Sequence, residues 1–187
     1  MQTRLTQEHV YQALKVLEVR YNATFRKKTN ALKNQIELGL ICKLSVIEFC
    51  GWIEVIVDEI LLHYISQNIV DVQTSEAAKA KVKKVHGCDP EGNLKPLLRE
   101  LIGYRGYAKY YGKYSTELDL ICNSINRVGG MININGHQER LRNIAAHTNY
   151  DQSLPTQQHF PTPSTVLYEF RVVHALLKKL RKHILHY

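Results

Sequence analysis

The residue types best suited to chemistry lie together in one short stretch, which runs from Arg142 through Asn143 to His147. A histidine titrates near pH 6.5, so it can remove or supply a proton at cellular pH. An arginine stays cationic and can hold two phosphate oxygens in a planar fork. Cutting an RNA phosphodiester without a metal needs these groups, because the 2′-hydroxyl must lose a proton, the leaving oxygen must gain one, and the phosphorane charge must be stabilised.

The spacing of these residues predicts one polar face if the stretch is helical. At about 100° per residue, Asn143 and His147 lie one above the other, with Glu139 one turn earlier on the same stripe. Arg142 lies beside that stripe and is long enough to reach across it. The opposite side is apolar and could dock on the rest of the protein; it consists of Leu141, Ile144 and Ala145.

The start of this helix is predicted from a capping pair. Asn135 is followed three residues later by Gln138, which is a helix-start signal. We therefore expect the helix that carries the candidate site to begin near Gly136. The polar stripe would then run from Glu139 to His147 on one helix.

The arginine, the polar residue after it and the histidine resemble the R-x4-6-H motif of HEPN domains. That family is all-helical and usually dimeric, and the resemblance implies a metal-independent endoribonuclease acting as a toxin or as an antiphage-defence effector. Arg142 and His147 would be the catalytic pair, with Asn143 as the polar residue beside them. HEPN toxins paired with a nucleotidyltransferase carry His-x-Tyr, whereas here Tyr150 lies one residue later. This departure puts modification of Tyr150 by a partner enzyme in doubt.

Two carboxylates are candidates for orienting the catalytic groups. Residues 51–61 resemble the long acidic helix of some HEPN branches, and Glu54 within them would orient Arg142 or a partner's histidine. Glu139 is the second candidate. The structural interpretation is that Arg142 pairs with Glu139 or a C-terminal carboxylate while His147 caps the helix end.

One histidine cannot easily act as base and acid in the same step. We therefore expect a two-fold homodimer that brings two copies of the motif to one cleft. The products would be a 2′,3′-cyclic phosphate and a 5′-hydroxyl.

A segment rich in tyrosine and basic residues is a candidate RNA-binding region. Aromatic rings can stack on unpaired bases while cations follow the phosphates. The alternative is a loop held to the protein by its rings, with the cations solvated. The candidate residues are Tyr104, Arg105, Tyr107, Lys109, Tyr110 and Lys113.

Composition favours one domain that associates with a polyanion. A chain of 187 residues with 44% hydrophobic residues can build a single core, so we expect one domain over residues 1–187. A net charge of +8 favours RNA, although an acidic antitoxin or regulatory protein would satisfy it as well. The sequence has no Gly-rich phosphate loop, nucleophile elbow or zinc-ligand spacing, so no cofactor or metal is expected.

The chain has no visible export signal, and charged residues interrupt its longest apolar region, residues 38–69. Cys42, Cys50, Cys88 and Cys122 show no paired spacing, so we expect reduced, mostly buried thiols. A cytoplasmic location without membrane contact follows from these observations.

Apolar spacing predicts an all-α fold, an antiparallel bundle with a long second helix and short accessory helices. Period-two alternation is nowhere sustained, and no Asn-Gly or Asp-Gly pair lies between two β-branched runs. We expect an irregular segment at 103–114 and helices at about 6–29, 32–70, 75–84, 94–102, 116–128, 136 onwards and 164–186. A rival from another class is a HEPN-like bundle that binds RNA or protein without cutting.

Overall fold

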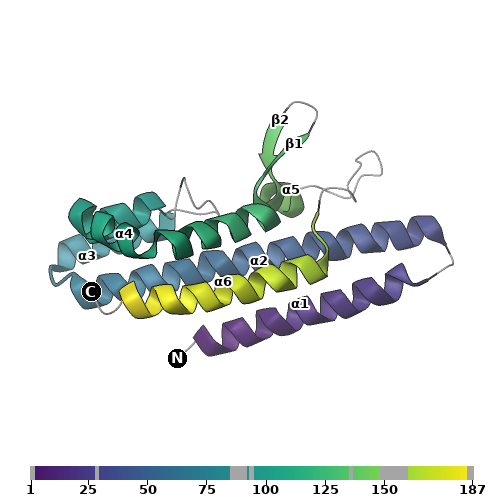
Figure 1. Cartoon of the computed structure of the whole chain (residues 1–187), viewed down its shortest axis with the longest axis horizontal. Coiled ribbons are helices and arrows are strands. Elements are labelled where there is room, and N and C mark those ends of the chain that lie inside the picture. Colours follow the sequence, from purple (N-terminus) through teal and green to yellow (C-terminus); the bar gives the residue numbers. More distant parts are fainter. Residues whose placement is uncertain are drawn as a thin grey trace. The chain divides into compact units, whose positions relative to one another are not determined.

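The computed structural model describes residues 3–27, 30–84, 92, 95–134, 137–147 and 160–184, some of them by their backbone alone. Within these ranges the chain is almost entirely helical (Figure 1), which confirms the predicted all-α fold. The helices are α1 (Thr3–Phe25), α2 (Ala31–Asn68), α3 (Val72–Lys84), α4 (Lys95–Gly129), α5 (Leu141–His147) and α6 (Pro163–Ile184). A hairpin of β1 (Met131–Ile134) and β2 (His137–Arg140) lies between α4 and α5.

The chain divides into two compact units, each built from separate parts of the sequence. Unit 1 contains residues 1–52 and 126–171, and unit 2 contains residues 53–125 and 172–187. Helices α2, α4 and α6 contribute residues to both units. The expectation of one domain over the whole chain stays a prediction.

Aromatic rings from three helices join the core of unit 1. The rings of Trp52 on α2 and Phe170 on α6 are 4.4 Å apart between centroids. Phe49 and Tyr11 extend the cluster, each at about 6 Å from one of these two rings. Because α1, α2 and α6 each contribute a ring, this cluster fixes the three helices against one another.

Unit 2 has an apolar core of its own. Its fully buried side chains come from the second half of α2, from α3, α4 and the end of α6. They include Leu61, Ile65, Val82, Leu98, Leu118, Ile121, Ile125 and Val173. An ion pair between Lys81 and Glu100 links α3 to α4 at the surface.

Helix α4 reverses its direction within unit 2. Lys95 Nζ lies 3.2 Å from Asp119 Oδ1, whereas a straight helix would separate two residues 24 positions apart by about 36 Å. Gly103 has a φ of +75°, a left-handed conformation that lets the helix turn there. The irregular segment expected at residues 103–114 is therefore wrong, because its backbone is helical and continuous with α4.

The hairpin replaces the start of a predicted helix. Its strands pair antiparallel, from Met131 with Arg140 to Ile134 with His137. Residues 137–140 are consequently strand, and the helix expected from Gly136 begins only at Leu141. The two residues between Ile134 and His137 are Asn135 and Gly136, and this dipeptide is the strongest short sequence signal for a two-residue hairpin turn.

Two helix starts have caps of their own. The Asp71 carboxylate accepts hydrogen bonds from the backbone N–H and the hydroxyl of Thr74, and these bonds lower the pKa of Asp71. Asp71 therefore caps α3, which begins at Val72 and not near residue 75 as the sequence predicted. Thr162 caps α6 in the same way, and Pro163 occupies the first helical position, which suits its fixed φ.

The described cysteines are buried, as the sequence predicted. Cys42, Cys50 and Cys122 are each at most 6% exposed, while Cys88 lies outside the described residues. Burial raises the pKa of the Cys42 thiol to about 11, so this group is protonated at neutral pH. Even the 38-residue α2 lacks a stretch apolar enough to cross a bilayer, and the same holds for the other described helices.

Candidate active site

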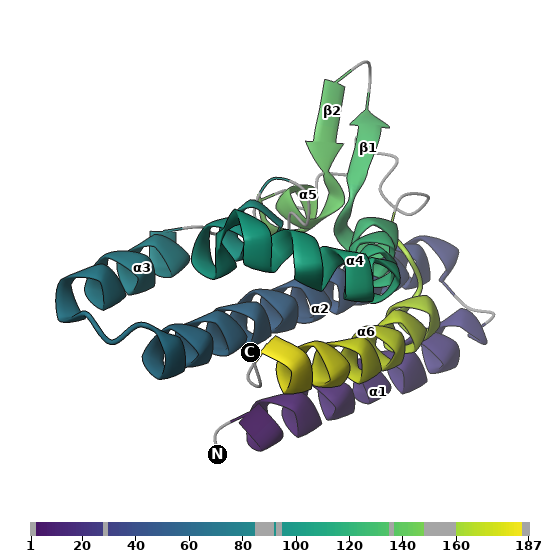
Figure 2. The ribbon, with the colours of Figure 1, turned by 60° about the vertical axis from the view of Figure 1, so that its left-hand side comes forward.

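The candidate site lies on α5, which the hairpin connects to the end of α4 (Figure 2). The backbone N–H of Leu141 donates a hydrogen bond to the carbonyl oxygen of Gly130, with a nitrogen to oxygen distance of 2.9 Å. This bond closes the base of the hairpin. It therefore fixes where α5 begins relative to the end of α4.

The apolar side of α5 is buried in unit 1. Leu141 is 4% exposed, Ile144 is 8% exposed and Ala145 is fully buried. These are the three residues that the sequence assigned to the docking face, so that prediction is confirmed. Burying apolar surface contributes about 25 cal/mol per Å², and this burial holds the short helix in place. An isolated helix of seven residues would not be stable in water.

Arg142 is anchored at a point of close approach between three elements. A Cβ atom built on Gly129 would lie 2.6 Å from the Cys50 Sγ and 3.4 Å from the Cβ of Arg142. Glycine at the end of α4 therefore leaves room for the Cys50 thiol of α2, and any larger residue would require a shift. Arg142 itself is partly buried, so its stem packs at this junction.

Asn143 and His147 are one turn apart on α5. Asn143 is exposed, while the side chain of His147 lies outside the described residues. The helix geometry places these two positions about 40° apart around the axis, but Arg142 and His147 about 140° apart. Arginine must therefore reach around the helix surface to act on the same phosphate as His147.

Glu139 does not belong to the same helix as Asn143. It lies on β2 opposite Ile132, and its side chain is exposed. The predicted stripe from Glu139 to His147 on one helix is therefore wrong, because the strand rotates successive side chains by half a turn rather than by 100°. An orienting role for Glu139 stays a prediction.

The other predicted site residues belong to unit 2. Glu54 is partly buried on α2, and its orienting role stays a prediction. The backbone of the six candidate RNA-binding residues is part of α4, but their side chains lie outside the described residues. They are Tyr104, Arg105, Tyr107, Lys109, Tyr110 and Lys113. Tyr150, near the site in sequence, also lies outside the described part of the chain.

Sequence reasoning missed an ion pair that fixes the end of α4. Arg127 donates two hydrogen bonds to Glu169 on α6, from Nε to Oε1 at 2.6 Å and from Nη2 to Oε2 at 2.9 Å. The Glu169 side chain is 4% exposed, and its hydrogen bonds raise the pKa of Arg127. A signal was present, because Glu169 is the one acidic residue of α6 and lies between the apolar positions Val166 and Phe170.

Comparisons with known proteins found no match for this chain. No protein-family model, no curated protein and no solved structure matches the chain. Across the described residues, no three side chains of His, Cys, Asp or Glu form a group that could hold a metal ion. Support for a function consequently comes from the residues and from the geometry of α5.

Proposed function

We propose that this protein is a metal-independent endoribonuclease of the HEPN type, with Arg142, Asn143 and His147 as its catalytic residues. The observation that supports the proposal most is the burial of one face of α5. Its apolar face is buried while Asn143 is exposed and Arg142 is partly exposed. A proton-transfer group and a phosphate-binding cation thus belong to one helix whose backbone is held in position.

The chemistry divides between the three side chains. His147 removes the proton from the ribose 2′-hydroxyl or protonates the leaving 5′-oxygen. Arg142 neutralises the charge that develops on the phosphorane oxygens, and Asn143 orients the imidazole or the substrate. The reaction forms a 2′,3′-cyclic phosphate and releases a 5′-hydroxyl end.

The proposed active form is a homodimer. One imidazole serves as base and the imidazole of a second copy serves as acid, so each cut requires two copies of α5 at one cleft. We also propose a cytoplasmic location and a role as a toxin or antiphage effector, restrained by an antitoxin or regulatory protein. These biological roles rest on the resemblance of the motif.

The proposal is tested by RNA cleavage in the presence of EDTA. The intact protein is expected to cut and to leave 2′,3′-cyclic phosphate ends. His147→Ala is expected to lower the rate by about 10²- to 10⁴-fold, the usual contribution of a general acid or base. Arg142→Lys is expected to be impaired as well, because an ammonium cannot form the two-pronged contact of a guanidinium.

Two matched control variants test whether a lower cleavage rate reflects loss of a catalytic group or only the removal of a charge or an imidazole. Arg26 and His63 are both exposed and lie outside α5, so Arg26→Ala and His63→Ala should cut at the normal rate. Circular dichroism establishes that each variant is folded. If both site variants cut RNA at the unchanged rate, α5 is not the catalytic element.

A second candidate function is a helical module that binds RNA or protein without cutting it. The partial burial of Arg142 and the closeness of its Cβ to Gly129 favour this reading, because they suit a structural arginine. Binding of RNA by a folded protein that cuts no RNA with or without EDTA would select it.

A further inference from the structure

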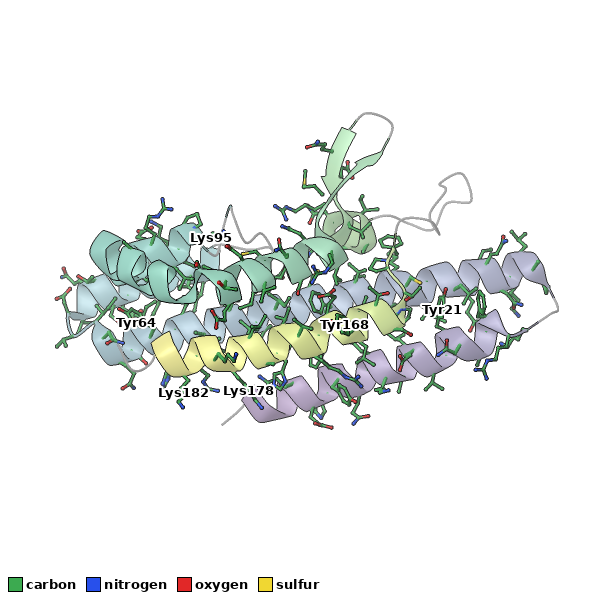
Figure 3. The ribbon with its side chains drawn as sticks, viewed as in Figure 1. Tyr21, Tyr64, Lys95, Tyr168, Lys178 and Lys182 are labelled. Atoms are coloured by element: carbon green, nitrogen blue, oxygen red, sulfur yellow. The ribbon has the colours of Figure 1, made fainter. Side chains whose placement is uncertain are left out.

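The end of α6 in unit 2 presents cations on one face of the helix. Lys178, Arg181 and Lys182 are exposed and lie at i, i+3 and i+4, so they share a stripe about one turn long. We refer to these three residues as the α6 basic stripe. Figure 3 labels Lys178 and Lys182 along the same edge of α6.

An adjoining face of the same segment, which meets the stripe at Arg181, is occupied by core packing. Val173 is fully buried, Leu176 is 8% exposed and Leu177 is 3% exposed. Half-buried His174 lies one turn before Lys178, and burial together with the Lys178 charge lowers its pKa, so it adds no charge at neutral pH. His174 therefore adds nothing at neutral pH to the charge of the α6 basic stripe.

Three described lysines of α3 and α4 form ion pairs, whereas Lys178 and Lys182 form none with the described residues. Lys79 pairs with Glu76, Lys81 pairs with Glu100, and Lys95 pairs with Asp119. For Lys178 and Lys182, the described residues supply no carboxylate within ion-pair distance. The sequence reinforces this difference, because no Asp or Glu occurs after Glu169.

We propose that the α6 basic stripe binds the phosphate backbone of single-stranded RNA. A row of exposed cations on a fixed helix provides attraction to successive phosphates and no readout of bases. An anionic membrane is the weaker candidate, because the apolar face of α6 is buried and cannot enter a bilayer. The choice of RNA over other polyanions rests on the proposed ribonuclease function, while the binding of an anionic polymer rests on α6 itself.

The test measures binding separately from cleavage. The probe is a fluorescent oligouridylate with 2′-O-methyl groups, which lacks the 2′-hydroxyl nucleophile and cannot be cut by the proposed mechanism. Its affinity for the full chain is measured by anisotropy across a salt series. The stripe variant is Lys178→Gln with Lys182→Gln, and the control is Lys33→Gln with Lys83→Gln, which removes the same charge from exposed positions elsewhere.

Counterion release sets the expected size of the effect. Each phosphate contact on a single strand contributes about 0.7 to the slope of log affinity against log salt, so losing two contacts lowers the slope by about 1.4 and the affinity about 25-fold at about 0.1 M salt. The control variant is expected to retain most of its affinity. Equal losses in both variants, or no loss in the stripe variant, would overturn the proposal.

Two further measurements distinguish the remaining outcomes. Vesicles containing phosphatidylserine test the lipid alternative, and binding to vesicles but not to the oligouridylate would overturn the RNA assignment. Cleavage of unmodified RNA is measured in parallel. Stripe-dependent binding without any cleavage would reject the ribonuclease proposal and keep the α6 basic stripe, whereas His147-dependent cleavage with intact binding by the stripe variant would do the reverse.

Discussion

Gly129 lies close to side chains of both α2 and α5 in unit 1. Its missing side chain leaves room for the Cys50 thiol and for the stem of Arg142. Gly129 thus contributes to the packing around the candidate arginine. Sequence reasoning identified Arg142 and its apolar neighbours from their spacing, but a close approach between residues 50, 129 and 142 leaves no local pattern to read.

Replacing Gly129 by alanine is expected to destabilise the protein by about 1 to 3 kcal/mol, the usual cost of overpacking a core. Adding Cys50→Ala should recover part of this loss, because it removes the sulfur that the new methyl group would contact. Urea unfolding of the single and double variants measures both effects. Gly51→Ala is the control, since no heavy atom lies within 4 Å of its added Cβ; a similar loss there would rule out the close approach as the cause.

His174 makes stability depend on pH. Burial, followed by the charge of Lys178, lowers its pKa below the usual histidine value of 6.5. Below about pH 6.5 the unfolded chain binds a proton that the folded chain does not, so acid favours unfolding through this group. The effect is absent above pH 6.5 and is complete below the lowered pKa of the folded state.

His174→Gln is therefore expected to flatten the decrease in stability between about pH 7.5 and 5.5. Urea midpoints measured at several pH values for both proteins provide the comparison. NMR titration of the imidazole tests the cause directly. A His174 pKa at or above 6.5 in the folded protein would contradict this account.

Two elements differ from what the sequence predicted, and each depends on glycine. The sequence predicted a helix in the place of each of the six described helices because their apolar spacing is set by burial, although it divided α4 in two and began α5 too early. On α6, the apolar residues Val166, Phe170, Val173 and Leu177 are buried. Sequence reasoning missed the hairpin because the Asn135-Gly136 signal is flanked by MINI and HQER, and only the first resembles a β-branched strand. It missed the helical backbone at 103–114 because the three glycines and the many tyrosines of this stretch have low helix propensity.

The two described glycines within this part of α4 should respond to substitution with opposite signs. Gly103 has a φ of +75°, so Gly103→Ala is expected to destabilise by about 1 to 2 kcal/mol. Gly112 has open space around it and lies in a helix, so Gly112→Ala is expected to stabilise by up to about 1 kcal/mol. Thermal unfolding of both variants measures the difference, and stabilisation by Gly103→Ala would show that α4 continues without a left-handed residue.

For the whole molecule, the central question is whether one chain can complete a catalytic site. The proposed mechanism needs two imidazoles, whereas each chain supplies one motif histidine on α5. Composition indicated attraction to polyanions through the net charge of +8, but it could not indicate which surface carries it. The structure indicates the surface, because it shows that Lys79, Lys81 and Lys95 pair with carboxylates.

Mixing experiments test whether two chains share one site. Adding an equal amount of His147→Ala chain to the intact protein, with subunit exchange, should reduce cleavage to about half, because random pairing leaves half of the intact chains in mixed dimers. Analytical ultracentrifugation establishes the dimer independently. Unchanged cleavage after complete exchange would mean that each chain works alone.

The hydrogen bond between Leu141 and Gly130 means that the main chain enters and leaves the hairpin at neighbouring points. The ten residues between them can therefore be lengthened, shortened or exchanged without altering the path of the polypeptide on either side. Evolution, or an engineer, could graft a new recognition loop there and keep the catalytic helix where it is.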